Sequence, residues 1–231
     1  MMQYLKNLIS RAKCLLSGIK YVRDSAIHPY AKIGGGILLK GDVHVSAHAK
    51  VSSDKDGRII LYRHSRLHPN SRIEAMSNSL VEIKESAMLS PGSVIFAHAN
   101  SQIIIGNGTS ISEYTLVTAQ NKVNIGEEVL MGPNVFIADY NHEYRDITKP
   151  INRQGHVFTD KDGNLNEVNI GDGCWLGKNV VIVGNVTIGR NTVIGANSTV
   201  VKDIPDNSVA VGNPANVIKR YNFTTNNWDR V

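Results

Sequence analysis

The feature that most constrains this chain is an aliphatic residue that returns at every sixth position. In the clearest run, the aliphatic positions are Ile170, Leu176, Ile182, Ile188, Ile194 and Val200. Four residues after each of the first five stands a small or β-branched residue, namely Cys174, Val180, Val186, Thr192 and Ser198. A period of six is neither the 3.6-residue period of a helix nor the alternation of a flat strand. It predicts short strands separated by corners, with one aliphatic side chain per side pointing into a narrow core.

The same period occurs in three shorter runs upstream. They are Ile125, Met131 and Ile137; Ile105, Ile111, Val117 and Val123; and Ile83, Leu89 and Ile95. The register slips between the runs, as expected where a residue or two is inserted at a corner, and upstream of Ile73 the pattern is ragged. Three six-residue sides would make a coil of about eighteen residues, and such coils gain stability by stacking. The sequence therefore predicts an all-β solenoid, a parallel β-helix, over residues 24–220.

Glycine and asparagine recur where this solenoid would turn its corners. The examples are Gly177, Asn179, Gly184, Asn185, Asn191 and Asn197. Both residue types tolerate the left-handed backbone angles that tight corners require. Aromatic residues make up only 6% of the chain and there are 20 glycines, a composition that suits a narrow, evenly layered β core.

Between Ile137 and Ile170 the period stops, which predicts a loop excursion over residues 139–168. Long loops in compact folds tend to carry function. His142 lies near the start of this loop, five residues after Ile137. The unperturbed pKa of histidine, about 6.5, suits the removal of a proton from an acceptor near neutral pH. His142 is therefore the candidate general base.

The repeat [Ile/Leu/Val]-Gly-x-x-[small]-x resembles that of the hexapeptide-repeat acyltransferases. The loop segment Asp-Tyr-Asn-His-Glu-Tyr-Arg-Asp, followed by Pro-Ile-x-x-Gln-Gly, is similar to the active-site stretch of the sugar O-acetyltransferases in that family. The resemblance implies a left-handed β-helix, a homotrimer with active sites between neighbouring prisms, and acetyl-CoA as co-substrate with no metal. It also implies direct acetyl transfer to a saccharide hydroxyl, with His142 as base and with Asn141, Tyr144 and Trp175 binding the substrate.

The residue that orients His142 is less well defined by the sequence. Asp139 is the favoured partner and is included among the catalytic residues. Asn141, Glu143 and Asp146 are also close in sequence. A residue of a neighbouring subunit is a further alternative.

The blocks that follow the loop are similar to the coenzyme A groove of the same family. The residues that the resemblance assigns to cofactor binding are Trp175, Gly177, Gly195, Ala196, Lys202, Lys219 and Arg220. A small residue at a corner lets a ligand approach the main chain closely, and cations are needed near the phosphates of the adenosine end. Cys174 occupies the small inward position of its repeat and is interpreted as a core residue rather than a nucleophile.

The two ends of the chain are expected to differ from the solenoid. Residues 1–23 have the apolar spacing of an amphipathic helix, with Lys6, Lys13 and Lys20 on another face. One interpretation is a helix that caps the array or docks on a neighbouring subunit, and the other is a peripheral contact with an anionic membrane surface. Residues 221–231 are predicted to form a polar C-terminal tail.

Cysteine content and charge bear on the compartment and the partners. Two cysteines do not make a disulfide framework, so a cytoplasmic location is expected, with the inner face of the membrane as the alternative. The net charge of +5 is compatible with a phosphorylated cofactor as well as with a polyanion. No nucleic-acid partner is predicted.

Three rival functions follow from the same pattern. N-acetylation of an amino sugar would need the same base and the same donor groove. A zinc-dependent γ-type carbonic anhydrase would need three histidine ligands, but the nearest histidines to His142 in sequence are His156 and, far upstream, His98. A non-catalytic scaffold is the third, because a β-helix by itself does not specify a function.

Overall fold

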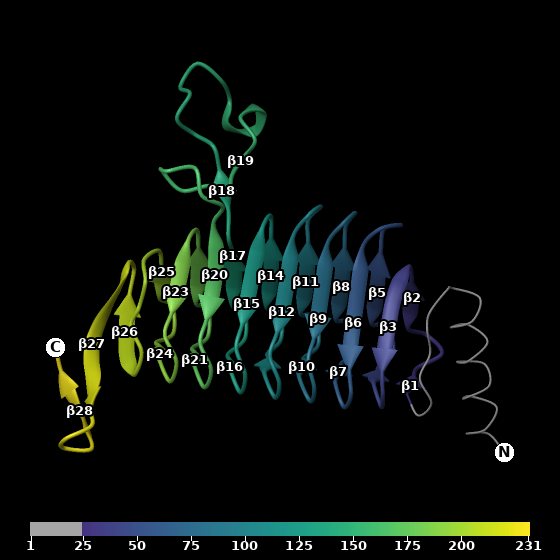
Figure 1. Cartoon of the computed structure of the whole chain (residues 1–231), viewed down its shortest axis with the longest axis horizontal. Helices are drawn as coiled ribbons and strands as arrows, with labels where there is room; N and C mark the ends of the chain where they lie inside the picture. Colours follow the sequence, from purple (N-terminus) through teal and green to yellow (C-terminus); the bar gives the residue numbers. More distant parts are fainter. Residues whose placement is uncertain (1–24) are drawn as a thin grey trace.

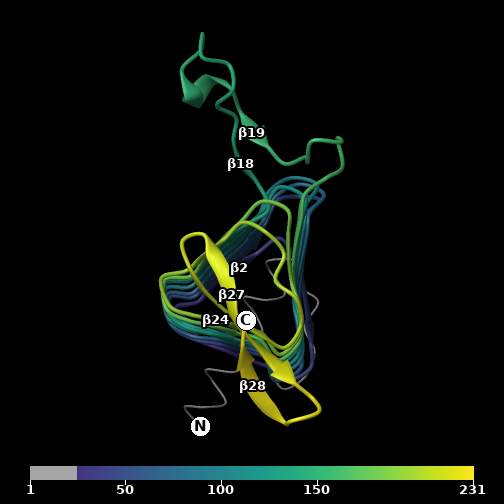
Figure 2. The same cartoon turned by 90° about the vertical axis from the view of Figure 1, so that its left-hand side faces the viewer.

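The computed structural model describes residues 25–231, and these form a triangular prism of stacked β coils with a loop projecting from one edge (Figures 1 and 2). The predicted helix over residues 1–23 lies outside the described residues. Each coil contributes one strand to each of three sheets, in the order 11-stranded, 8-stranded, 7-stranded sheet. Within the coils, every strand pairs in parallel with the corresponding strands of the coils before and after it. The predicted parallel β-helix is confirmed.

The 11-stranded sheet is made mainly of two-residue strands and ends in an antiparallel hairpin. Its strands are, in order, β1 (Ala26–Ile27), β4 (His44–Val45), β7 (Arg66–Leu67), β10 (Met88–Leu89), β13 (Ser110–Ile111), β16 (Leu130–Met131), β21 (Trp175–Leu176), β24 (Val193–Ile194), β26 (Ser208–Gly212), β27 (Ala215–Asn222) and β28 (Asn227–Arg230). The expected tail from residue 221 is part of this hairpin, because β27 runs on to Asn222 and β28 pairs with it.

The other two sheets have longer strands and meet at the edge from which the loop projects. The 8-stranded sheet consists of β2 (Lys32–Gly34), β5 (Lys50–Ser53), β8 (Arg72–Ala75), β11 (Val94–Ala97), β14 (Leu116–Ala119), β17 (Phe136–Ala138), β22 (Val181–Val183) and β25 (Thr199–Val200). The 7-stranded sheet consists of β3 (Gly36–Lys40), β6 (Arg58–Tyr62), β9 (Leu80–Ile83), β12 (Gln102–Ile105), β15 (Lys122–Ile125), β20 (Glu167–Ile170) and β23 (Val186–Ile188).

The core is a column of stacked aliphatic side chains along the axis of the prism. All six aliphatic positions of the predicted run from Ile170 to Val200 are buried, and so are the five small positions between them. In the 8-stranded sheet, for example, Ile95 aligns with Val117, and Val117 with Ile137. Burial of such side chains contributes roughly 25 cal/mol per Å² of apolar surface, which each coil obtains from its neighbours above and below.

The coils upstream of Ile73 follow the same architecture although their sequence pattern is ragged. Val45 aligns with Leu67, 22 residues on, and Leu67 aligns with Leu89 after the same interval. Leu176 and Ile194, by contrast, are 18 residues apart. The longer N-terminal coils break the six-residue period in the sequence while keeping the inward side chains in register.

The predicted corner conformations are confirmed at several positions. Asn179, Asn191 and Asn197 have φ of 58°, 52° and 60°, and Gly184 has φ of 97°. These angles lie in the left-handed region that asparagine and glycine enter most readily.

Candidate active site

The loop leaves the prism at the edge between the 8-stranded and 7-stranded sheets, after β17, and returns at β20 (Figure 1). Its stem is an antiparallel pair, β18 (Asn141–His142) and β19 (His156–Val157). Its tip carries the short 3-10 helix η1 (Ile151–Arg153). In the stem, His142 is paired with His156 and Asn141 with Val157. The stem therefore presents the candidate base beside a second histidine.

Four rings form a continuous cluster at the base of the loop, which we call the ring cluster: His98, Tyr140, His142 and His156. The ring centroids of His142 and His156 are 4.7 Å apart, and those of His156 and Tyr140 are 5.0 Å apart. Tyr140 and His98 follow at 5.5 Å with nearly perpendicular planes. The His142 side chain lies at the exposed end of the cluster, where an acceptor can reach it.

Polar contacts join the ring cluster to the prism. The side-chain amide Nε2 of Gln120 lies 3.1 Å from Nδ1 of His156. The Tyr140 hydroxyl lies 3.4 Å from Nε2 of His98 and 3.5 Å from the hydroxyl of Thr118. Burial lowers the pKa of His98, and charge repulsion from the nearby imidazole of His156 lowers it further. The inner end of the cluster is therefore biased toward the neutral state.

Asp139 lies fully buried at the root of the loop. Its carboxylate accepts hydrogen bonds from the backbone N–H groups of Gln120, Asn121 and Lys122, at 2.8, 2.7 and 2.6 Å. Burial raises the pKa of the Asp139 carboxyl above its usual value, while the three amides act in the opposite direction. Among the described residues, none of these hydrogen bonds involves His142. The direct orienting role predicted for Asp139 thus has no geometric counterpart in one chain, because the turn at 120–122 occupies the carboxylate oxygens.

The other acidic residues considered as partners of His142 are engaged within the loop. Glu143 accepts hydrogen bonds from the guanidinium of Arg145, which lowers the pKa of Glu143 to about 2. Asp146 binds the Thr148 hydroxyl and pairs with Lys149. The substrate-binding candidates Asn141 and Tyr144 are both exposed on the loop.

The residues predicted to hold the cofactor lie toward the C-terminal end of the prism. Gly177 and the pair Gly195–Ala196 follow the neighbouring strands β21 and β24 and stack directly on each other. A Cβ atom on Gly177 would lie 2.5 Å from the backbone nitrogen of Ala196, so the stacking of these corners requires glycine there. Trp175 begins β21 and is 52% exposed, as its outward position predicts.

The predicted phosphate-binding cations lie on the last strands. Lys219 and Arg220 belong to β27, which pairs with β26 at the end of the 11-stranded sheet. Lys202 follows β25, and its Nζ lies 2.9 Å from the side-chain oxygen of Asn216 in β27. Lys219 and Arg220 therefore lie near one end of the prism, beyond the coils that carry the small corner residues, whereas Lys202 belongs to the same coil as Gly195–Ala196.

One chain does not bring Trp175 and His142 together. Trp175 lies on the 11-stranded sheet, whereas the loop leaves the edge between the other two sheets (Figures 1 and 2). Trp175 and the candidate base therefore lie on opposite sides of the same prism, whereas Lys202 follows β25 at the same edge as the loop.

Cys174 is buried in the core, as its repeat position predicts. Its thiol lies 3.0 Å from the carbonyl oxygen of Gly189, and burial raises the pKa of the thiol to about 11. A protonated, inaccessible thiol is a poor nucleophile. Cys174 is therefore not positioned to form an acyl-enzyme.

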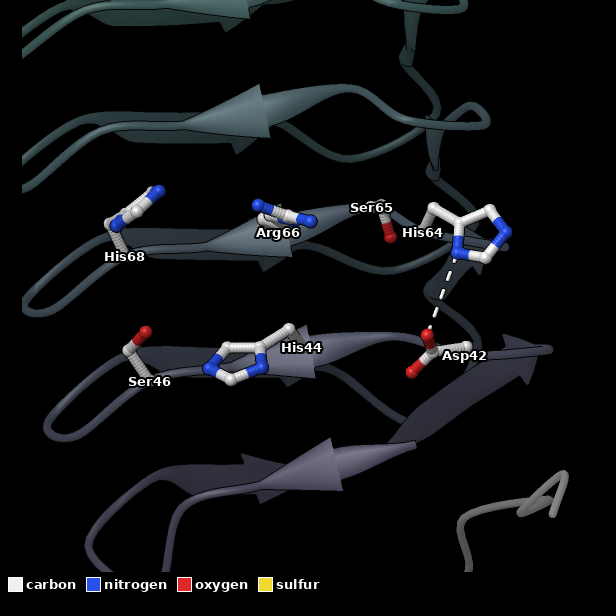
Figure 3. Close-up of a pocket in the computed structure, with 7 residues that line it drawn as sticks. All are labelled: Asp42, His44, Ser46, His64, Ser65, Arg66 and His68. Atoms are coloured by element: carbon white, nitrogen blue, oxygen red, sulfur yellow. Dashed lines mark ion pairs between the residues drawn. The ribbon is translucent and has the colours of Figure 1, made fainter. Parts of the chain in front are cut away.

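A separate pocket lies on the outer face of β4 and β7, well upstream of the loop in sequence. It is lined by Asp42, His44, Ser46, His64, Ser65, Arg66 and His68 (Figure 3). Within it, Nδ1 of His64 lies 3.5 Å from a carboxylate oxygen of Asp42. None of the residues predicted for the site lines this pocket.

The clustering of His98, His142 and His156 could not be read from their spacing in the sequence. Parallel stacking brings the corner of His98 beside the loop, and the β18–β19 pairing brings His156 beside His142. Even so, no group of three or more histidine, cysteine, aspartate or glutamate side chains within residues 25–231 is arranged to hold a metal ion. The ring contacts are aromatic contacts rather than a ligand set.

Comparison with known proteins identifies the family. Residues 167–202 match the model described as "Bacterial transferase hexapeptide (six repeats)". The galactoside O-acetyltransferase of Escherichia coli is 33% identical over 170 residues, which are 72% of this chain and 78% of that protein. The galactoside O-acetyltransferase of Lactococcus lactis is 30% identical over 155 residues, 67% of this chain and 70% of that protein.

This chain belongs to the hexapeptide-repeat acetyltransferases. A solved structure of a galactoside acetyltransferase in complex with coenzyme A agrees with this assignment. It is 33% identical, superposes with a TM-score of 0.50, and covers 63% of this chain and 66% of that one. The prism described above is the left-handed parallel β-helix of this family, as the sequence predicted.

Proposed function

We propose that this hexapeptide-repeat acetyltransferase moves the acetyl group of acetyl-CoA to a sugar hydroxyl, with His142 as the general base. The observation that carries the proposal is the exposed position of the His142 ring on the stem of a loop that interrupts the coils. The nature of the acceptor is supported by the two relatives named as galactoside O-acetyltransferases. The nature of the donor is supported by the relative solved with coenzyme A.

The chemistry assigned to His142 is a proton transfer during direct attack. The imidazole takes the proton of the acceptor hydroxyl as the oxygen attacks the thioester carbonyl, so a C–O bond forms and a tetrahedral intermediate results. The C–S bond then breaks, and the proton on the imidazole passes to the departing thiolate of coenzyme A. The step needs no cysteine nucleophile, in keeping with the burial of Cys174.

We further propose that the working site is shared between chains of a homotrimer. The separation of Trp175 and His142 on opposite sides of one prism supports this proposal. A second support is the outer face of the 8-stranded sheet, which is apolar over neighbouring strands. By strand alternation its outward residues include Val94, Phe96, Leu116, Phe136, Val181 and Val183. Contiguous apolar surface of this kind is typical of protein–protein contacts.

Acetyl-CoA would lie along the stacked corners of Gly177 and Gly195, with Trp175 beside its thioester end. Glycine at these corners lets the coils stack closely, because a Cβ atom on Gly177 would meet Ala196 and one on Gly195 would meet Val211. Lys202, Lys219 and Arg220 would meet the phosphates at the adenosine end. Asn141 and Tyr144 on the loop of the neighbouring chain would contact the sugar.

The test of the base is acetyl transfer by the His142→Ala variant. Thiol release from acetyl-CoA is measured with a galactoside acceptor, and the product is identified by mass spectrometry. We expect kcat/KM to fall by about 10²–10⁴-fold while the assembly keeps its mass. His48→Ala, an exposed histidine on an N-terminal coil, is the matched control and should retain full activity. A kcat/KM of His142→Ala within threefold of the wild-type value would refute the assignment. One zinc ion per chain in the purified wild-type protein would reopen the carbonic anhydrase alternative.

The shared site has its own test, since two inactive variants can complement one another. His142→Ala and Trp175→Ala chains are co-expressed with different tags, and mixed assemblies are isolated through both tags. A shared site predicts that mixed assemblies regain activity that neither parent has, because some sites receive both intact residues. Mixed assemblies as inactive as His142→Ala alone would place the site within a single chain.

A separate experiment decides between O- and N-acetylation. Wild-type protein is given hydroxyl sugars and amino sugars side by side, and the acetylated product is identified.

For the part of the chain that the structure describes, no helix is long and apolar enough to cross a membrane. The membrane interpretation of residues 1–23, the alternative to a capping or docking helix, is tested by flotation of the full and shortened chains with anionic vesicles. Equal recovery of the two forms would refute this contact.

A further inference from the structure

We propose that His156 is a positioning residue for His142, and that Asp139 acts on the base indirectly, through Gln120 and His156. The inference rests on the proposed function of His142. It replaces direct contact between Asp139 and the base with a connected chain of contacts from the buried root of the loop to its exposed stem.

The first contact is between the two imidazoles. His142 and His156 are directly opposite in the antiparallel stem, and their ring centroids are 4.7 Å apart with planes inclined by 54°. The stem strands have only two residues each, and one further backbone hydrogen bond joins Glu143 to Gly155 at 3.0 Å. So short a ladder constrains the backbone but does not itself fix the exposed imidazole of His142. The contact that limits rotation of this imidazole is the neighbouring ring of His156.

The second contact fixes the ring of His156 itself. The Nε2 atom of Gln120 can only donate, so Nδ1 of His156, 3.1 Å away, is the acceptor. With the amide in this orientation, the neutral ring carries its proton on Nε2. Tyr140, with its ring centroid 5.0 Å from that of His156, packs against the same imidazole. His156 is thus held by a polar contact and by ring contacts, whereas among the described residues His142 has only its ring contact with His156.

The third contact holds Gln120. The turn at 120–122 donates three backbone hydrogen bonds to the buried carboxylate of Asp139. Asn121 in the same turn also donates its side-chain amide to the carbonyl of Asn166, 2.8 Å away, where the loop returns to the prism. One turn therefore anchors both ends of the loop and carries the side chain that fixes His156. A displacement of the turn would be transmitted to the base.

This geometry matters because general base catalysis depends on placement. A misplacement of the reacting groups by about 1 Å can cost on the order of 10²-fold in rate. A ring that holds His142 in place should therefore affect turnover more than binding. It should not affect acetyl-CoA affinity, because within the described chain His156 contacts none of the residues proposed to hold acetyl-CoA.

The kinetic test compares His156→Ala, Gln120→Ala and the double variant, in the full-length assembly. We expect His156→Ala to lower kcat about tenfold with KM for acetyl-CoA unchanged, and Gln120→Ala to lower kcat by a smaller factor. Because Gln120 acts through His156, the double variant should be no slower than His156→Ala. His156→Phe, which keeps a ring but loses the acceptor nitrogen, should recover part of the loss. Wild-type kcat for His156→Ala, or multiplicative losses in the double variant, would overturn the proposal.

A second readout needs no acceptor. The ring of His142 is located by crystallography, or by NMR of histidine-labelled protein, in wild type and in Gln120→Ala. We expect the ring to lose its single orientation in the variant, and an unchanged ring would refute the relay. If His142→Ala remains active, the general base assignment fails and His156 loses its role with it. If His142→Ala is inactive while His156→Ala is as active as wild type, only the role of His156 fails.

Discussion

Replacing Asp139 by asparagine tests the root of the loop more sharply than any other change. The carboxylate is fully buried and accepts three backbone N–H groups at 2.6–2.8 Å. In Asp139→Asn, the remaining oxygen can keep the N–H groups of Asn121 and Lys122. The new NH₂ group then faces the N–H group of Gln120. These two donors, at a part-buried site, are left without an acceptor.

The expected cost follows from these two donors. An unsatisfied buried donor costs about 1–3 kcal/mol, so the variant should lose about 2–6 kcal/mol of stability in the coils around the turn. In a solenoid this loss is local, because each coil contacts only its neighbours. Hydrogen exchange should rise first in the 120–125 segment and in the loop stem. The Asp139→Asn substitution should also lower kcat, because the displaced turn acts on His142 through Gln120 and His156.

The assay is thermal unfolding followed by circular dichroism, together with hydrogen exchange resolved by mass spectrometry. Asp203→Asn is the matched control, since Asp203 accepts one N–H, from Thr187 at 2.7 Å, and is exposed. The control should lose no more than about 1 kcal/mol. An unchanged melting temperature and unchanged exchange at 120–125 in Asp139→Asn would refute the reasoning.

Three further predictions concern single side chains. Because burial raises the pKa of Cys174 to about 11, iodoacetamide at pH 8 should leave the Cys174 peptide unlabelled in native protein and label it in urea; rapid native labelling would contradict its burial. Gly177→Ala should lower the free energy of unfolding by about 1–3 kcal/mol and raise KM for acetyl-CoA, because the new Cβ would meet the backbone nitrogen of Ala196. A variant with wild-type stability and wild-type KM would show that the corner can relax. The folded pKa of Glu143 is lowered to about 2, so the stabilisation from its ion pair with Arg145 is present at neutral pH and is lost only as the pH falls toward 2. The free energies of unfolding of wild type and Glu143→Gln should therefore differ less at pH 2 than at pH 7. A larger difference at pH 2 would contradict the direction of this pKa shift.

The solenoid and the place where it is interrupted can both be read from the spacing of residues along the chain. A six-residue period permits only a chain that turns after every short strand, and all aliphatic positions from Ile170 to Val200 are buried as the period requires. The loop, the exposed His142 and the buried Cys174 follow from the same register. These features depend on local spacing, which a sequence displays directly.

Which side chains contact one another depends on how the coils stack. His98, Gln120 and His156 are separated by many residues, and they come together because parallel coils stack and because the loop folds back on itself. The same stacking turned Asp139 toward the backbone of the preceding coil and set Trp175 on the side of the prism away from His142. Contacts between coils depend on coil length and corner geometry, and the N-terminal coils show that these vary without changing the core. A linear pattern records the inward positions of each coil, but the neighbours of an outward side chain exist only once the coils are stacked.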